Sequence, residues 1–287
     1  MQRGSLVALA AALISVVVVA SASARPQATT PVTETAASGN VRAELSYLKE
    51  VDSGGFTRYS NLRLTITRNG QAVSNTPPRS SPIEGLWPGN AWKAGAKSVH
   101  VADLDGDNEP EVSLDLFTGG AHCCRMYWAY RWDGATYVAQ EIQTGSSSYT
   151  QRDLNRDRRS EWITTDPRFE YLFTSFAGSG VPIRIYTYRD GSFVVVTKSY
   201  PALVRKDAAR WWRIYQRERT AANHDNRGFL AAWAADMYLR GLGAKVWPAL
   251  NAAYRRGDLT VPRGNGPTGR AYINKLRKKL RELGYSG

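Results

Sequence analysis

The stretch that decides the fold of the first part of the chain reads SVHVADLDGDNEPEVSLDL (residues 98–116). Apolar and polar residues alternate on both sides of an acidic run, which is the period of a β-strand whose side chains point to opposite faces. The order strand, acidic loop, strand returns fifty residues later in YTQRDLNRDRRSEWITT (149–165). The two stretches therefore predict antiparallel strands joined by acidic turns.

The first acidic loop, DLDGDNEPE (103–111), has the ligand spacing of a calcium-binding loop. Carboxylates stand at positions 1, 3, 5 and 9, and a glycine at position 4 permits a sharp turn. Alternate side chains converge on one point, and a backbone carbonyl at position 7 helps to complete the six to eight oxygens that Ca²⁺ takes. Without a cation, four carboxylates this close would repel one another, and the alternative is a solvated acidic turn. The predicted ligands are Asp103, Asp105, Asp107, Glu109 through its backbone, and Glu111.

The second loop, DLNRDRRSE (153–161), repeats the positions with poorer chemistry. Arg156 replaces the glycine, and three arginines crowd the loop. These cations either lower the affinity for calcium or stand in for the metal, and both alternatives stay open. The predicted ligands are Asp153, Asn155, Asp157 and Glu161.

This pair of loops resembles the FG-GAP/VCBS repeat family of extracellular proteins, over residues 95–165. In that family each unit carries a D-x-D/N-G-D-G-x-x-D/E loop, and a full set closes a calcium-braced β-propeller. The resemblance implies bound Ca²⁺, an extracellular setting and recognition rather than catalysis. The second loop lacks the family glycine, no third copy is found, and a complete seven-bladed propeller needs a longer chain.

The rest of residues 41–200 carries further β signals. Asn69-Gly70, Asp133-Gly134 and Asp190-Gly191 supply the positive φ angles of hairpin turns. Together these features predict a calcium-binding β domain of antiparallel sheets, either a partial propeller or a sandwich. The expected strands are 41–51, 61–67, 110–118, 126–132, 136–142, 160–165, 182–189 and 192–199.

After Pro201 the apolar period changes to that of helices, which predicts a small all-α domain over 201–287. Phe229, Leu230, Trp233 and Met237 form most of one stripe. Trp233 is expected in the core, whereas one of the adjacent pair Trp211-Trp212 could be exposed. The expected helices are 202–222, 227–241, 244–256 and 268–283.

Positive charge is concentrated in the helical part. Residues 201–287 hold 18 Lys and Arg against 6 Asp and Glu, a net +12 of the +13 of the whole chain. Such a field attracts polyanions, so an anionic cell-wall polymer or an acidic glycan is a candidate partner. Anionic lipid head groups and released nucleic acid are further candidates, although no motif of a specific nucleic-acid reader occurs. The alternative is a solvated basic surface.

The N-terminus has the three parts of a secretory signal peptide: a positive start, the apolar run 6–20 and the small-residue site Ala22-Ser23-Ala24. We expect a signal peptide over 1–24 and a secreted, extracellular product with no further transmembrane segment. An uncleaved anchor is the alternative, but the apolar run is shorter than a spanning helix. Residues 25–40, rich in Thr, Ala, Pro and Ser, are expected to be a flexible linker.

The two cysteines are adjacent, at Cys123 and Cys124, after Gly119-Gly120. Free thiols rarely persist in an oxidising compartment, which favours a vicinal disulfide. A copper or zinc site with His122 is a second reading, although neighbours in a strand point to opposite faces. Reduced or intermolecularly paired cysteines are the third.

No catalytic motif stands out. His100 reads as a strand residue and His224 lies in a polar connection between helices, and no nucleophile, zinc-protease or phosphate-loop signature occurs. Paired carboxylates for glycoside hydrolysis are invisible in a sequence. We therefore expect a secreted calcium-binding protein for recognition or attachment at the cell surface, with a glycan or cell-wall hydrolase as the alternative.

Overall fold

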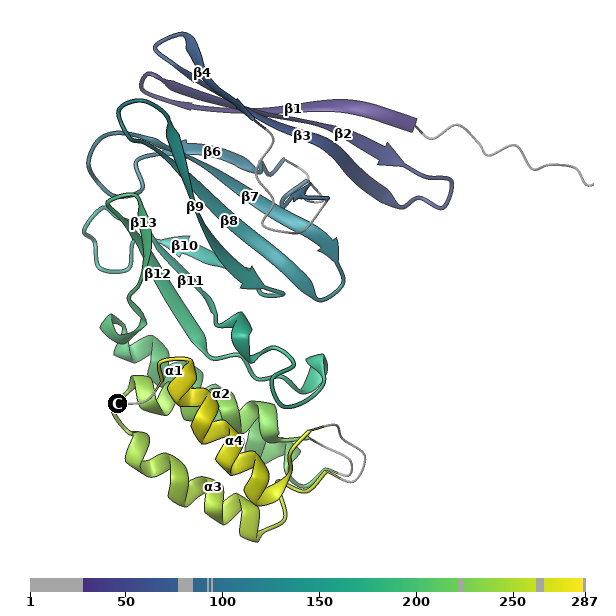
Figure 1. Ribbon diagram of the computed structural model, residues 1–287, viewed down its shortest axis with the longest axis vertical. Helices are drawn as coiled ribbons and strands as arrows, with labels where there is room; N and C mark the ends of the chain where they lie inside the picture. The colour runs from purple at the N-terminus through teal and green to yellow at the C-terminus, as the bar shows by residue number, and fades with distance from the viewer. Residues whose placement is uncertain are drawn as a thin grey trace, which may run out of the picture.

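The computed structural model describes residues 28–76, 85–91, 93, 95–221, 225–261 and 266–285. The expected signal peptide (1–24) and His224 lie outside the described residues. Among the described helices, none combines the length and the apolar character that a membrane crossing requires. Mostly antiparallel β-sheets form the N-terminal part, and four α-helices form the C-terminal part (Figure 1).

Three antiparallel sheets follow one another along the chain. Within each sheet, most neighbouring strands are consecutive in the sequence. The first sheet holds β1 (Ala28–Ser38), β2 (Val41–Val51), β3 (Thr57–Arg68) and β4 (Gln71–Thr76). The second holds β5 (Trp87–Pro88), β6 (Val99–Ala102), β7 (Glu111–Gly120), β8 (Cys123–Trp132) and β9 (Tyr137–Gly145). The third holds β10 (Thr150–Arg152), β11 (Glu161–Thr165), β12 (Ile183–Arg189) and β13 (Ser192–Val195).

The sheets stack face to face, with the second in the middle (Figure 1). Strand β8 shows why. Its residues Met126 and Trp128 belong to the apolar core shared with the first sheet, whereas Tyr127 and Ala129 pack toward Trp162 and the third sheet. A strand that is apolar on both faces must be covered on both sides, so the run MYWAY fixes β8 as the centre of the stack.

The expected flexible linker over 25–40 is wrong for residues 28–38, because they form strand β1. This strand pairs with β2 over its whole length, from Ala28 opposite Val51 to Ser38 opposite Val41. The buried Glu34 carboxylate accepts a hydrogen bond of 2.9 Å from the Tyr47 hydroxyl. A mostly polar segment is thus ordered by pairing with a neighbouring strand, with Val32 and Ala36 packed against the core.

The three expected hairpin turns are confirmed. Asn69 and Gly70 join β3 to β4 with φ angles of 50° and 77°, and Asp190 and Gly191 join β12 to β13 with 48° and 76°. Between β8 and β9, Asp133 Oδ1 accepts the backbone N–H groups of Ala135 and Thr136, both at 2.8 Å. Local turn chemistry therefore sets the registers of these three strand pairs.

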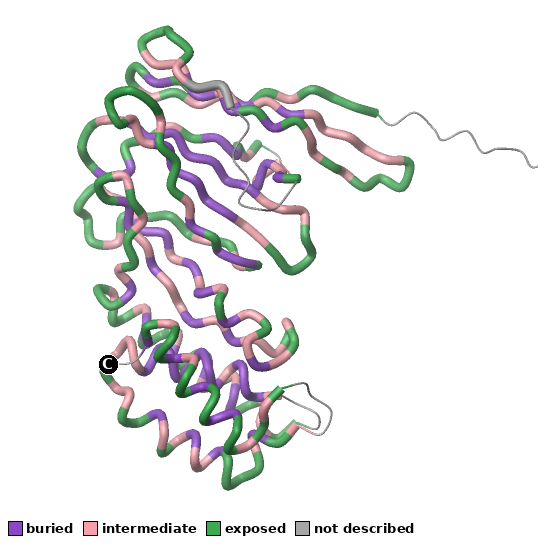
Figure 2. Tube along the Cα trace, viewed as in Figure 1, coloured by how far each residue is buried: buried purple, intermediate pink, exposed green. Residues whose placement is uncertain are grey.

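The helices are α1 (Pro201–Glu218), α2 (Arg227–Leu239), α3 (Val246–Arg255) and α4 (Gly269–Glu282). Helix α2 is apolar nearly all round and lies at the centre, as the continuous burial along it shows (Figure 2). Trp233 is buried as expected, Trp211 is also buried, and Trp212 is half-buried with its ring centroid 4.7 Å from that of Trp233. The tryptophans of α1 and α2 therefore serve the core.

Side-chain contacts, as well as the chain itself, hold the helices against the β part. Phe169 and Phe173, from the connection between β11 and β12, are members of the helical core. Asp166, at the end of β11, is fully buried and accepts a 2.8 Å hydrogen bond from the hydroxyl of Tyr285 beyond α4. These contacts fix the C-terminal end of the described chain against the third sheet.

Candidate metal site

The two acidic loops occupy equivalent positions in neighbouring sheets. Residues 103–110 connect β6 to β7, and residues 153–160 connect β10 to β11. Because the second and third sheets stack, the loops touch: Arg159 Nε of the second loop donates a hydrogen bond to the backbone carbonyl of Asp105 in the first. The repeat seen in the sequence is therefore a repeat in space.

Both loops share one hydrogen-bonded frame. Asp103 accepts the N–H groups of Gly106 (2.7 Å) and Asn108 (3.0 Å), and Asp153 accepts those of the residues at the same positions, Arg156 (2.6 Å) and Arg158 (2.9 Å). The glutamate at position 9 also acts alike in both loops: Glu111 Oε2 accepts the N–H of position 2 at 2.9 Å, and Glu161 Oε2 does so at 2.8 Å. Positions 4 and 6 have positive φ in each loop. The spacing of the aspartates thus dictates the same turn with or without the glycine.

The first loop brings three carboxylates to one point. Asp103, Asp105 and Glu111 each offer one oxygen, and these oxygens lie within 4.8 Å of one another. Asp105 is 5% exposed and Glu111 is fully buried. Within the described part of the chain, Asp105 Oδ1 and Glu111 Oε1 are buried with no hydrogen-bond partner. A buried carboxylate oxygen without a partner carries a large desolvation cost, and a bound cation would remove that cost.

The electrostatics of the two buried carboxylates, Asp105 and Glu111, point the same way. Burial, and then the nearby charges of the other loop aspartates, raise the pKa of Glu111 to about 8. Burial also raises the pKa of Asp105, with Asp107 adding to the shift. Without a metal, ionisation of Asp105 and Glu111 is therefore unfavourable, and Arg131 at 3.9 Å offsets only part of this cost.

Two arginines outside the loop hold the remaining acidic side chains. Arg131 of β8 pairs with Asp107 at 2.8 Å, and its Nε lies 3.9 Å from carboxylate oxygens of both Asp105 and Glu111. Arg68 of β3 forms a two-pronged pair with Glu109. Although burial alone would raise the pKa of Asp107, Arg131 and the N–H of Glu109 lower it overall. The side chains at positions 5 and 7 are thus engaged by protein cations, and sequence reasoning gave no sign of either arginine.

Calcium fits the donor set of the first loop. Asp103, Asp105, Asp107 and Glu111 carry four formal negative charges, whereas Arg131 and Arg159 bring two positive charges to the loop. The acidic side chains of this loop therefore outnumber the cations beside them. Hard carboxylate and carbonyl oxygens are the ligands that calcium prefers, and the unpartnered oxygens of Asp105 and Glu111 are free to serve as such.

The second loop does not converge in this way. Among the described residues, Asp153, Asp157 and Glu161 form no group of three close carboxylate oxygens. Asn155 instead donates to Asp157 at 3.0 Å, and the charges of Arg159 and Arg189 act on the same aspartate. Glu161 is buried like Glu111, and its Oε1 also lacks a partner within the described ranges. The two loops therefore share the hydrogen-bonded backbone turn, but only the first brings three carboxylates together.

Cys123 and Cys124 lie at the end of the β7–β8 hairpin, with their sulfur atoms in bonding contact. The neighbouring His122 ring stacks on Phe176, with ring centroids 4.1 Å apart, and its Nδ1 lies 2.8 Å from the Tyr171 hydroxyl. No group of three metal-binding side chains in the described chain includes His122 or the cysteines. The aromatic partners of His122 come from the connection before β12 and were not foreseen.

Taken together, the described residues form a stack of antiparallel sheets that carries a cluster of three acidic side chains, followed by a basic bundle of helices. The family model of the sll0997 C-terminal domain matches residues 204–284, which extend from within α1 to just beyond α4. A probable thylakoid lumen protein, sll0997 of Synechocystis sp. (strain ATCC 27184 / PCC 6803 / Kazusa), is 27% identical over 224 residues. The alignment covers 76% of this chain and 62% of the relative, so the chain spans about three fifths of that protein's length. No solved structure matches.

Proposed function

We propose that this protein works outside the cytoplasm as a calcium-braced recognition or attachment protein. The observation that carries the proposal is the convergence of Asp103, Asp105 and Glu111 with two buried, unpartnered oxygens. Calcium would neutralise these charges and pin the β6–β7 connection. Because the same loop contacts Arg159 of the third sheet and Arg68 of the first, the ion would brace all three sheets.

Two observations on translocation across a membrane also support the proposal. The N-terminal segment has the pattern of a signal peptide, and the Synechocystis relative is named a thylakoid lumen protein. We propose that this chain is likewise translocated, with secretion to the cell exterior as the specific form. In an oxidising compartment Cys123 and Cys124 would form a vicinal disulfide, consistent with the contact of their sulfur atoms.

Recognition is assigned to the basic outer face of the helices. In α4, Lys275, Arg277 and Arg281 are exposed, and the one acidic residue of the helix, Glu282, is already paired with Lys278 and Lys279. Arg277 also lies over the Trp247 ring at 4.4 Å. A row of exposed cations beside an aromatic ring suits an anionic cell-wall polymer or an acidic glycan.

The hydrolase alternative gains no support from the carboxylates that approach each other. Asp207 and Asp236 form such a pair. Burial, and then the neighbouring charge of Asp207, raise the pKa of Asp236 to about 10. Asp236 is fully buried between helices, and Asp207 receives the Trp211 ring N–H and the backbone N–H of Ile183. This pair belongs to the packing of α1 and α2 and does not face a substrate.

The deciding experiment is calorimetric titration of the full chain with CaCl₂ and with MgCl₂. We expect calcium to bind at one site and magnesium to bind far more weakly, because Mg²⁺ demands a near-ideal octahedron and gives up its waters reluctantly, whereas Ca²⁺ accepts irregular oxygen sites. Asp105→Ala should abolish calcium binding. Its matched control is Asn155→Ala, at the same position of the second loop, which should bind calcium as the wild type does. Unchanged titration of Asp105→Ala would refute the site.

The recognition surface has its own test. A triple substitution, Lys275→Gln with Arg277→Gln and Arg281→Gln, should lower the affinity for purified wall teichoic acid, and the wild-type affinity should fall steeply with salt. The control is Arg42→Gln, an exposed cation of the first sheet that is paired with Glu44. Binding that ignores both salt and the triple substitution would contradict this assignment without touching the calcium site.

A further inference from the structure

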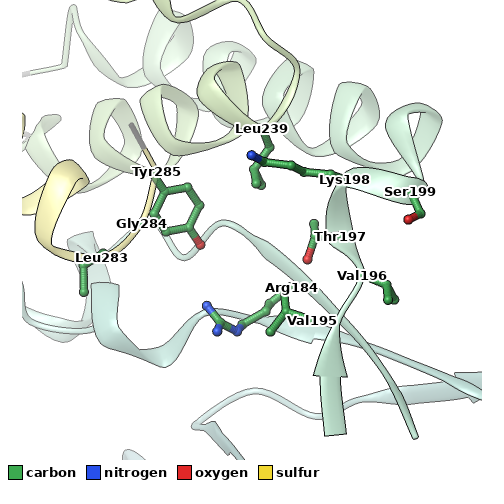
Figure 3. Close-up of a pocket in the computed structure, with 10 residues that line it drawn as sticks. All are labelled: Arg184, Val195, Val196, Thr197, Lys198, Ser199, Leu239, Leu283, Gly284 and Tyr285. Carbon is green, nitrogen blue, oxygen red and sulfur yellow. The ribbon is translucent and has the colours of Figure 1, made fainter. Parts of the chain in front are cut away.

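A cavity of about 290 Å³ lies where the third sheet meets the helices, away from the acidic loops. Its walls come from β12, the segment after β13, the end of α2 and the chain beyond α4. In the close-up, Arg184 and Lys198 stand on opposite sides of the space, Tyr285 borders it on one side and Thr197 on the other (Figure 3). Four distant segments thus meet around one opening.

The polar part of this cavity is positive. Among the described residues that line it, two are cations, Arg184 and Lys198, and none is acidic. Arg184 does have an ion-pair partner behind the wall, Asp166, at 2.9 Å. However, Asp166 also pairs with Arg168 and accepts the Tyr285 hydroxyl, so a single carboxylate serves two guanidinium groups. One positive charge of this cluster is left over, and Lys198 adds a second.

The Arg184 side chain is partly open beside the cavity. Its Nε is buried and has no hydrogen-bond partner within the described ranges. The side chain is 20% exposed, which means that water does not fully solvate this group. The buried Nε is out of reach of a ligand, so contact with an anion falls to the exposed part of the guanidinium group.

Aliphatic side chains form part of the remaining lining, together with Thr197, Ser199 and Tyr285. Leu239 of α2, Leu283 after α4 and Val195 at the end of β13 contribute aliphatic surface beside the two cations. An opening of about 290 Å³ has room for a small organic molecule. Apolar walls with a few convergent polar groups are typical of small-molecule sites.

We propose that this cavity binds a small organic carboxylate with a short aliphatic body. The carboxylate accepts hydrogen bonds from Arg184 and faces the ammonium group of Lys198, while the aliphatic part lies against Leu239 and Leu283. Ligand binding here links the third sheet to the helices and does not depend on calcium or on the basic outer face.

The test is calorimetric titration of the full chain with octanoate, octan-1-ol and inorganic phosphate. Octanoate should bind, whereas octan-1-ol, which lacks the charge, and phosphate, which lacks the aliphatic body, should bind at least about tenfold more weakly. Equal binding of octan-1-ol would show an apolar slot only, and tighter binding of phosphate would show an inorganic-anion site. Either result, or no binding of octanoate, would overturn the proposal.

Two arginines provide a matched pair of variants. Arg184→Gln and Arg168→Gln each remove one partner of Asp166, but only Arg184 lines the cavity. Arg184→Gln should weaken octanoate binding by at least about tenfold, and Arg168→Gln, which removes the excess charge beside Asp166 but no cavity-lining side chain, should weaken it clearly less. If Arg184→Gln fails to fold, the exposed Lys198 serves instead, since Lys198→Gln should fold normally and weaken octanoate binding several-fold. Equal affinities for the wild type and these variants would refute the assignment.

Discussion

The loops 103–111 and 153–161 share a backbone and differ in their charge. In each, the first aspartate accepts two backbone N–H groups and the last glutamate is buried and accepts the N–H of position 2. In the first loop three carboxylates converge; in the second, an asparagine and nearby arginines occupy the neighbourhood. The difference teaches that the aspartate spacing specifies a turn, whereas cation binding also needs uncompensated carboxylates around it.

Removing the last glutamate from each loop should give the largest contrast. With calcium at a hundredfold excess over its Kd, Glu111→Ala should lose about 2.7 kcal/mol of ligand stabilisation. The orphaned N–H of Leu104 adds about 1–3 kcal/mol. Glu161→Ala should lose only the contribution of the orphaned N–H, which in this loop belongs to Leu154. Urea unfolding with calcium measures both, and equal losses would mean that the loops do not differ in function.

The pH dependence of the calcium-free protein sharpens the comparison further. Burial and the neighbouring carboxylates raise the pKa of Glu111 from 4.5 to about 8. Between these values the folded protein holds a proton that the unfolded chain has released, so the free energy of unfolding should fall as pH rises through that window. Urea unfolding in EGTA across this range should show the fall in the wild type and in Glu161→Gln. Glu111→Gln should flatten it, and a fall that persists in Glu111→Gln would contradict the assignment.

The smallest effects concern position 4 of each loop. Gly106 has φ of 79° and Arg156 has φ of 65°, a region that costs a residue with a Cβ about 1 kcal/mol. Gly106→Ala should therefore destabilise by about 1 kcal/mol, since its Cβ would meet Arg159 only at an ordinary contact distance of 3.5 Å. Arg156→Gly should stabilise by about 0.5–1 kcal/mol. Thermal unfolding in EGTA measures both, and a loss of stability in Arg156→Gly would show that the arginine side chain supports the turn.

Much of the architecture could be predicted because the signals are local. The Asn-Gly and Asp-Gly turns need positive φ, and the apolar stripe of α2 needs a covered face, so both are visible in a short window of sequence. Strand β1 was missed for the opposite reason. Its residues are small and polar, and its order comes from pairing with β2 and from the buried bond between Glu34 and Tyr47.

The sequence by itself determined the two acidic turns, since the aspartates bond to N–H groups only three to five residues away. Only the tertiary structure decided which carboxylates are paired with an arginine and which remain available to a cation. Arg131 reaches Asp107 from 24 residues away and Arg68 reaches Glu109 from 41, because β8 and β3 end beside the loop. Charge interactions depend on distance in space and on burial, and these two quantities are fixed by the stacking of sheets and not by spacing along the chain.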